Sequence, residues 1–117
     1  MVEDYVSFET AKLLKEKGFD APCDWAYTKE GNIFKPIYWY EDFPRPTLQM
    51  AMTWLREKKD VQIEISIVGT DTWESPTKWM YGFRCQTKNV IDRRNADFLL
   101  YEEACEAAIK YCLENLI

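Results

Sequence analysis

Three segments of the chain place apolar residues three and four positions apart, which is the spacing of a helix with one buried face. The first helix is predicted to begin after Ser7, whose side chain can cap it, and to stop at Gly18. Thr47 caps the second helix, and the third begins at about Tyr101. The inner faces consist of Phe8, Ala11 and Leu14; of Leu48, Ala51, Met52 and Leu55; and of Ala104, Cys105, Ala108, Ile109, Cys112 and Leu116.

Two other segments, residues 61–67 and 79–86, alternate apolar with polar residues, which is the period of a half-buried strand. We expect them to pair as antiparallel neighbours. The connection between them, residues 69–78, is long for a hairpin and carries Trp73 among polar residues. The polar stretch 88–97 that follows is expected to be a loop.

Aromatic residues are densest between residues 24 and 43. A turn signal at residues 30–32, Glu-Gly-Asn, divides this segment into two short strands of a predicted hairpin. Pro36 lies in the second strand and has no amide proton to donate, so that strand is expected at an edge or only partly paired. The rings of the segment are those of Trp25, Tyr27, Phe34, Tyr38, Trp39, Tyr40 and Phe43.

The order helix, hairpin, helix, hairpin, helix differs from the regular alternation of strands and helices in a parallel sheet. It predicts an α+β fold, in which three helices lie mainly on one face of an antiparallel sheet of three or four strands. The other face would stay partly open to water or to a partner. The length of 117 residues predicts a single globular domain spanning residues 1–117.

Net charge lowers the expectation of nucleic-acid binding. Twenty acidic against fifteen basic side chains give a net charge of −5, and the acids are spread along the chain. The densest basic runs are Arg56, Lys58 and Lys59, and Arg93 and Arg94. Because duplex binders normally present a basic patch that releases counterions, we expect no binding to duplex nucleic acid.

The chain has no histidine, which removes the usual agent of triad and zinc chemistry. Its cysteines, Cys23, Cys85, Cys105 and Cys112, form no C-x-x-C pair, so no metal site and no cofactor are expected. The acidic N-terminus has no apolar leader, and no stretch has the length of a membrane span. These features predict a cytoplasmic protein whose cysteines are free thiols packed as small apolar side chains.

Three blocks carry a resemblance to a known group of proteins. They are residues 6–20 (VSFETAKLLKEKGFD), 46–57 (PTLQMAMTWLRE) and 101–109 (YEEACEAAI). In sequence and order they resemble uncharacterised small proteins carried by prophages and mobile elements of gut bacteria. The resemblance implies no activity, cofactor or site. Where those proteins commonly cap the last helix with Thr or Ser, this chain has Leu100, so the cap shifts to Asp97 or the helix frays at its start.

The residues most suited to bind a partner or ligand lie in the aromatic segment and in the long connection. Trp39 and Tyr40 can stack on a sugar or a cation while Glu41 and Asp42 bond to it. The alternative is an edge strand with a solvated acidic end. Trp73 either folds back onto the sheet or marks a contact surface.

A second group of carboxylates, Glu102, Glu103 and Glu106, is explained without a function. The three residues lie in the first turns of the predicted last helix, where the helix dipole favours negative charge. We therefore expect them to form a solvated polar face.

Two functional hypotheses follow. The first is a protein-binding or adaptor module, which could form a homodimer through the aromatic hairpin or the open sheet face. The second is a small enzyme, or a sugar-binding domain, that uses the acids and tyrosines of residues 25–43. No catalytic residue is assigned, and the lack of histidine and of glycine-rich loops favours the first. A pocket lined by buried carboxylates with raised pKa values would favour the second.

Overall fold

The computed structural model of the chain describes residues 4–35, 43–68, 78–87 and 90–117. Its three helices are separated by groups of strands in an α+β fold, which confirms the predicted class and the predicted order of helices and strands, although each group has three strands and not two. The elements are α1 (Phe8–Glu16), β1 (Ala26–Tyr27), β2 (Ile33–Phe34), β3 (Phe43–Pro44), α2 (Leu48–Lys59), β4 (Val61–Val68), β5 (Lys78–Cys85), β6 (Val90–Phe98) and α3 (Tyr101–Asn115).

The larger sheet has the antiparallel order β4-β5-β6. As the alternating pattern predicts, β4 pairs with β5, in a continuous register from Val61 opposite Cys85 to Val68 opposite Lys78. The third strand, β6, occupies the polar stretch that was expected to be a loop. That expectation is wrong because an edge strand of a sheet with one uncovered face can carry polar residues, so polarity alone does not exclude a strand.

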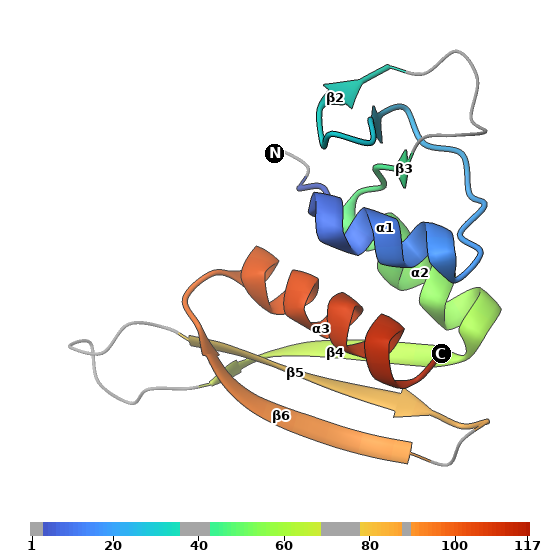
Figure 1. Cartoon of the computed structure of the whole chain (residues 1–117). Coiled ribbons are helices and arrows are strands. Elements are labelled where there is room, and N and C mark those ends of the chain that lie inside the picture. Colours follow the sequence, from blue (N-terminus) through green and yellow to red (C-terminus); the bar gives the residue numbers. More distant parts are fainter. Residues whose placement is uncertain (1–3, 36–42, 69–77, 88–89) are drawn as a thin grey trace.

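All three helices lie on one side of this sheet, as expected (Figure 1). Helix α3 rests on the sheet and contacts all of its strands, whereas α2 contacts β4 and α3. Helix α1 packs on α3 and on β3. The layers are therefore sheet, then α3, then α1 with the short strands beyond it (Figure 1).

A cluster of buried side chains joins the helices to the sheet. The ring of Tyr111 on α3 stacks on Phe83 of β5, with ring centroids 5.4 Å apart. Phe19, which follows α1, meets Trp54 of α2 edge to face. The largest fully buried apolar side chains include Val6, Leu14, Leu55, Val61, Ile109 and Leu113.

The ends of α1 follow the predicted signals. Ser7 is the N-cap, and its side chain accepts a hydrogen bond from the amide of Thr10. Gly18 has a φ of 92°, in the left-handed region that glycine adopts without strain. The amide of Phe19 donates to the carbonyl of Leu14 at 2.9 Å. This is the hydrogen bond across six residues that defines a Schellman turn.

The other helices show one expected cap and one missing cap. The Thr47 side chain accepts from the amide of Met50 and caps α2. Leu100 precedes α3 and provides no side-chain hydrogen bond, so α3 begins at Tyr101 without a cap. Because Leu100 stands where a Thr or Ser could cap the helix, the first turn of α3 lacks the side-chain hydrogen bond that stabilises a typical helix start.

The smaller sheet has the order β2-β1-β3. Its β1 and β2 form the predicted hairpin, in which Thr28 and Asn32 bond across the turn and Gly31 has a φ of 87°. Strand β3 pairs with the other side of β1. Pro44 lies in β3, at an edge of the sheet, where proline is tolerated.

Candidate functional site

The residues selected from the sequence as candidate contacts, Trp39, Tyr40, Glu41, Asp42 and Trp73, lie outside the described part of the chain. Their role stays a prediction.

Tyr27, a described ring of the aromatic segment, is structural, whereas Trp25 is 38% exposed. Tyr27 is 7% exposed, and its hydroxyl donates to the carbonyl of Val6 at 2.6 Å. The same hydroxyl accepts from Nε of Arg45 at 3.2 Å, and the Arg45 guanidinium lies 4.0 Å from the ring centroid of Tyr5. Tyr27 is thus a buried hydrogen-bonding residue that fixes the start of the chain against β1.

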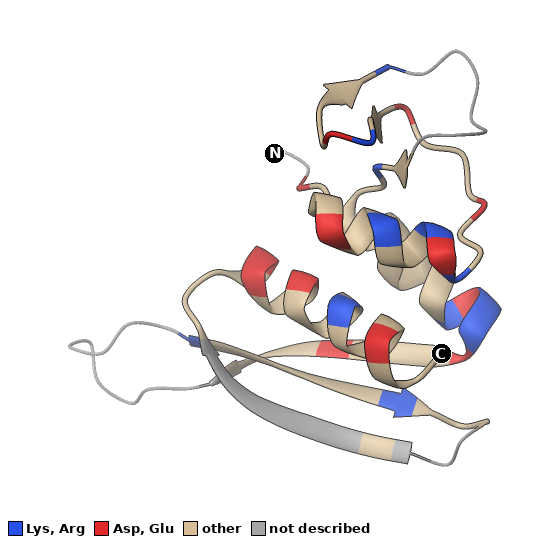
Figure 2. Cartoon of the chain, viewed as in Figure 1, with Lys and Arg blue, Asp and Glu red and all other residues tan. Residues whose placement is uncertain are grey.

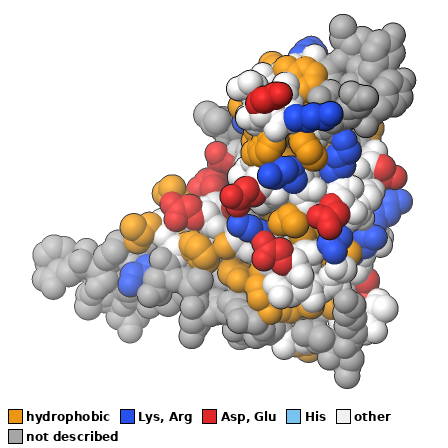
Figure 3. Space-filling model, viewed as in Figure 1, with side chains coloured by type: hydrophobic (Ala, Val, Ile, Leu, Met, Phe, Trp, Pro, Cys, Tyr) orange, Lys and Arg blue, Asp and Glu red, His pale blue; other side chains and the backbone are white. Residues whose placement is uncertain are grey.

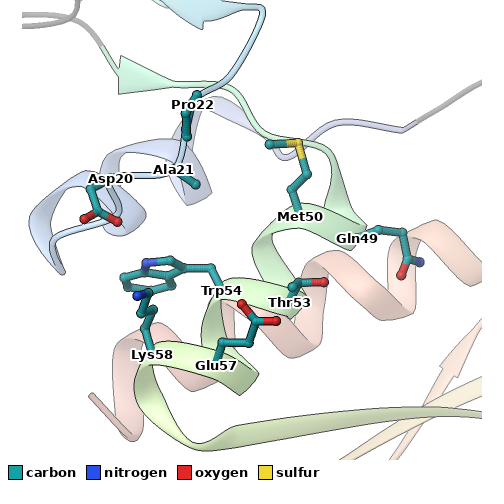
Figure 4. A pocket seen from close by; sticks show the side chains of 9 residues that line it. All are labelled: Asp20, Ala21, Pro22, Gln49, Met50, Thr53, Trp54, Glu57 and Lys58. Atoms are coloured by element: carbon teal, nitrogen blue, oxygen red, sulfur yellow. The ribbon is translucent and has the colours of Figure 1, made fainter.

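The described residues contain an apolar groove on the outer side of α2, which we call the α2 groove. Its volume is about 530 Å³. One wall is the segment after α1 and the other is α2 itself (Figure 4). The lining residues are Asp20, Ala21, Pro22, Gln49, Met50, Thr53, Trp54, Glu57 and Lys58.

Local sequence explains why this groove forms. The Schellman turn at Gly18 ends α1 and sends residues 20–22 past α2. On α2, positions 50, 53, 54 and 57 share one side of the helix by their three- and four-residue spacing. This side lies next to the stripe of Leu48, Ala51 and Leu55 that faces the core. The signal that could have revealed the groove was Trp54, an apolar residue outside the inner face predicted from the sequence.

The groove combines a rigid ring with charges at its rim. Trp54 is only 5% exposed and is held by its edge contact with Phe19, whose ring centroid is 5.4 Å away. Asp20, on one wall, and Glu57, on the other, are exposed acids, and Lys58 is the basic residue of the lining (Figure 4). Such a surface can take an apolar side chain that has a cation beside it.

A second hollow, of about 460 Å³, lies where the first turns of α3 approach the start of α1. Its lining includes Asp4, Glu102, Glu103 and Glu106, and Figure 2 shows the acids of α3 below the start of α1. Desolvation, and then the nearby Glu102, raise the pKa of Asp4 above its ordinary value. Asp4 itself is exposed, so this is not the pocket of buried carboxylates that would favour an enzyme.

Glu106 is a structural part of this hollow. Its Oε1 accepts from the amide and the hydroxyl of Ser7, and from the hydroxyl of Thr10 at 2.6 Å. Its other oxygen, Oε2, is buried and has no hydrogen-bond partner. Glu106 therefore places a carboxylate at the N-terminus of α1, where the helix dipole favours it. The expectation that Glu106 belongs to a solvated face is wrong, because α1 packs against that face.

The cysteines are free thiols, as expected. All four are buried. Burial raises the pKa of Cys23 and Cys105 to about 11, and that of Cys112 to about 12. Such thiols are poor nucleophiles near neutral pH.

Among residues 4–35, 43–68, 78–87 and 90–117, no group of three or more cysteine and carboxylate side chains is placed to hold a metal ion. None of the helices in the described part of the chain has the length and apolar character that spanning a bilayer requires.

The chain is an α+β protein with an apolar groove on α2. Comparisons with protein-family models, with curated proteins and with solved structures find no match to it.

Proposed function

We propose that the chain is a small protein-binding module that receives an apolar side chain of a partner protein in the α2 groove. The observation that carries the proposal is the buried indole of Trp54 in a groove bordered by Met50 and Pro22. Concave sites lined by aromatic and apolar side chains are typical of surfaces that receive an apolar group of a partner.

The charges at the rim indicate which partner segment fits. The exposed carboxylates of Asp20 and Glu57 can pair with a lysine or arginine beside the apolar side chain. On the basic side, Lys58 lines the groove and Lys59 holds its Nζ 5.5 Å from the centroid of the Trp54 ring. The net charge of −5 favours a basic partner segment.

The enzymatic alternative receives less support. The groove lining contains neither histidine nor cysteine. Tyr27, a described tyrosine of residues 25–43, is engaged by Val6 and Arg45 in the core. The binding hypothesis therefore remains the better one.

An origin in a prophage or mobile element and a location in the cytoplasm form part of this proposal. The resemblance of residues 6–20, 46–57 and 101–109 supports the origin. The packing of all four cysteines as free, buried thiols supports a reducing compartment.

Two synthetic tetrapeptides test the groove. Both have a central leucine-phenylalanine pair, which lysines flank in one peptide and glutamates in the other. In two-dimensional amide NMR spectra, we expect the lysine peptide to shift the resonances of α2 and of residues 20–22 more strongly than the glutamate peptide does.

A matched pair of variants completes this test. Thr53→Arg places a long side chain in the groove and should abolish the shifts. Gln86→Arg adds the same side chain at an exposed position outside the groove and should leave them unchanged. Absence of shifts with both peptides, or shifts that persist in Thr53→Arg, would refute the proposal.

A further inference from the structure

Strand β4 forms an edge of the larger sheet and, among the described strands, pairs only with β5. It is eight residues long, with the sequence VQIEISIV. It contains no proline, glycine or lysine, and its register with β5 has no bulge. Natural sheets normally use such features to prevent an edge from pairing with another chain. The β4 edge has no proline, lysine or bulge, and Glu64 is the one charged residue in its sequence.

The opposite edge differs in the number of its charged residues and in its register. Strand β6 carries Asp92, Arg93, Arg94 and Asp97 in its sequence. Its register with β5 is interrupted between Trp79 and Tyr81. Charged residues and bulges are the usual protection of an edge. The contrast singles out β4 as the edge suited to pairing.

Exposure of the apolar residues on β4 increases along the strand. Val61 is fully buried, Ile63 and Ile65 are partly buried, and Ile67 is 58% exposed. Because these side chains alternate with polar ones, all four lie on the helix side of the sheet. The last of these isoleucines thus extends the apolar surface beyond the core.

We propose that β4 pairs antiparallel with β4 of a second copy of this chain, which joins two three-stranded sheets into one of six strands. This goes beyond the proposed function and does not depend on the α2 groove. A second copy is favoured because the sequence of β4 is complementary to itself in one register.

Symmetry limits the possible registers. In an antiparallel pair related by a two-fold axis, the axis passes through a residue that faces its own copy. If the axis passes through Glu64, two identical carboxylates face each other, which is destabilising. If it passes through Ile63 or Ser66, the two strands overlap over fewer residues.

The axis through Ile65 avoids both penalties. Residues 62–68 then overlap, with Ile65 opposite the partner's Ile65 and Ile63 opposite the partner's Ile67. On the other face, Glu64 lies opposite the partner's Ser66, whose hydroxyl can donate to the carboxylate. Glu64 keeps its ion pair with Arg84, at 3.4 Å within its own chain. This register packs the exposed Ile67 against the partner's Ile63 without opposing like charges.

Sedimentation velocity over a series of concentrations tests the contact. The wild-type chain should approach twice the 13.9 kDa mass of one chain as its concentration rises. Ile67→Lys should raise the dimer dissociation constant by at least about tenfold, since an edge lysine opposes strand pairing. The matched control, Ile91→Lys, changes a 72% exposed isoleucine on β6 and should leave the constant unchanged.

Crosslinking tests the register separately. Ile65→Cys brings two thiols opposite each other and should give a disulfide-linked dimer on mild oxidation. In Ile67→Cys, the two new thiols would be about 13 Å apart along the strands, too far for a disulfide. We therefore expect no crosslink in this variant.

Crosslinking also decides the outcome if Ile67→Lys fails to fold. A monomeric wild type at all concentrations, a dimer weakened only by Ile91→Lys, or failure of Ile65→Cys to crosslink would overturn the proposal. Loss of peptide binding in the NMR test would leave it standing, because the α2 groove and β4 share no residue.

Discussion

Glu106 shows how a side chain can have a role that its neighbours in the sequence do not indicate. From the helical pattern it belongs to a solvated acidic face, together with Glu102 and Glu103. In the structure its carboxylate accepts hydrogen bonds from Ser7 and Thr10, residues almost a hundred positions away. Thr10 is fully buried, and its hydroxyl donates to Glu106 while it accepts from the hydroxyl of Ser7 at 3.2 Å.

Glu106→Ala is expected to lower the free energy of unfolding by about 2 kcal/mol, because it removes the charge-assisted hydrogen bonds that Ser7 and Thr10 donate to the carboxylate. Urea denaturation measures the change. Glu103→Ala, at an exposed position of the same helix, is the control and should change the value by less than about 0.5 kcal/mol. Equal effects of the two substitutions would show that the contact contributes nothing specific.

The cysteines allow a second test at this scale. Burial raises the pKa of Cys23, Cys105 and Cys112 well above the ordinary 9.0, so little thiolate forms at pH 8. The folded protein should react only very slowly with a chromogenic disulfide reagent. In concentrated guanidinium chloride, without reductant, all four thiols should react. A count below four in the unfolded protein would contradict the assignment of free thiols.

At the scale of elements, local signals determine where helices start and stop. Ser7 and Thr47 cap α1 and α2, and Gly18 ends α1, all within a few residues of the hydrogen bonds they make. Asp60 has a different role. It takes the left-handed conformation between α2 and β4, with a φ of 56°, and its carboxylate accepts from the amide and the hydroxyl of Thr87. It thereby ties the α2–β4 corner to the end of β5.

This contact makes stability depend on pH. The hydrogen bonds from Thr87 lower the pKa of Asp60 below its ordinary 3.8 in the folded state. Because the pKa of Asp60 is lower in the folded than in the unfolded state, its carboxylate stabilises the fold fully at pH values above 3.8. This stabilisation is lost as the pH falls from 3.8 through the pKa of the folded state. Compared with Asp60→Asn, which also tolerates a positive φ, the wild type should melt at a higher temperature at pH 7.

The same comparison at low pH provides the control. The difference in melting temperature between the wild type and Asp60→Asn should shrink as the pH falls below 3.8. Thermal scans followed by circular dichroism at several pH values measure it. A difference that is independent of pH would exclude the charge of Asp60 as its source.

At the scale of the whole molecule, charges of both signs are mixed on the face seen in Figure 3. The prediction that the chain does not bind duplex nucleic acid continues to rest on the net charge of −5. The α2 groove and the β4 edge are separate surfaces, so a dimer would leave its two grooves available to partners.

The sequence by itself predicted the α+β class, the limits of the helices and the pairing of β4 with β5. These depend on caps, turns and periodic burial, which act over a few residues. Strand β6 was missed because its polar residues resemble those of a loop, and pairing with β5 makes it a strand.

Only the tertiary structure revealed the α2 groove and the hydrogen bonds of Glu106. Each requires segments distant in sequence to meet. Residues 20–22 pass α2 because Gly18 turns the chain, and Ser7 reaches Glu106 because α1 packs on α3. Periodicity shows which side of an element is buried, but it does not show which element covers that side. Packing of the whole chain decides this, and with it the surfaces that remain for a partner.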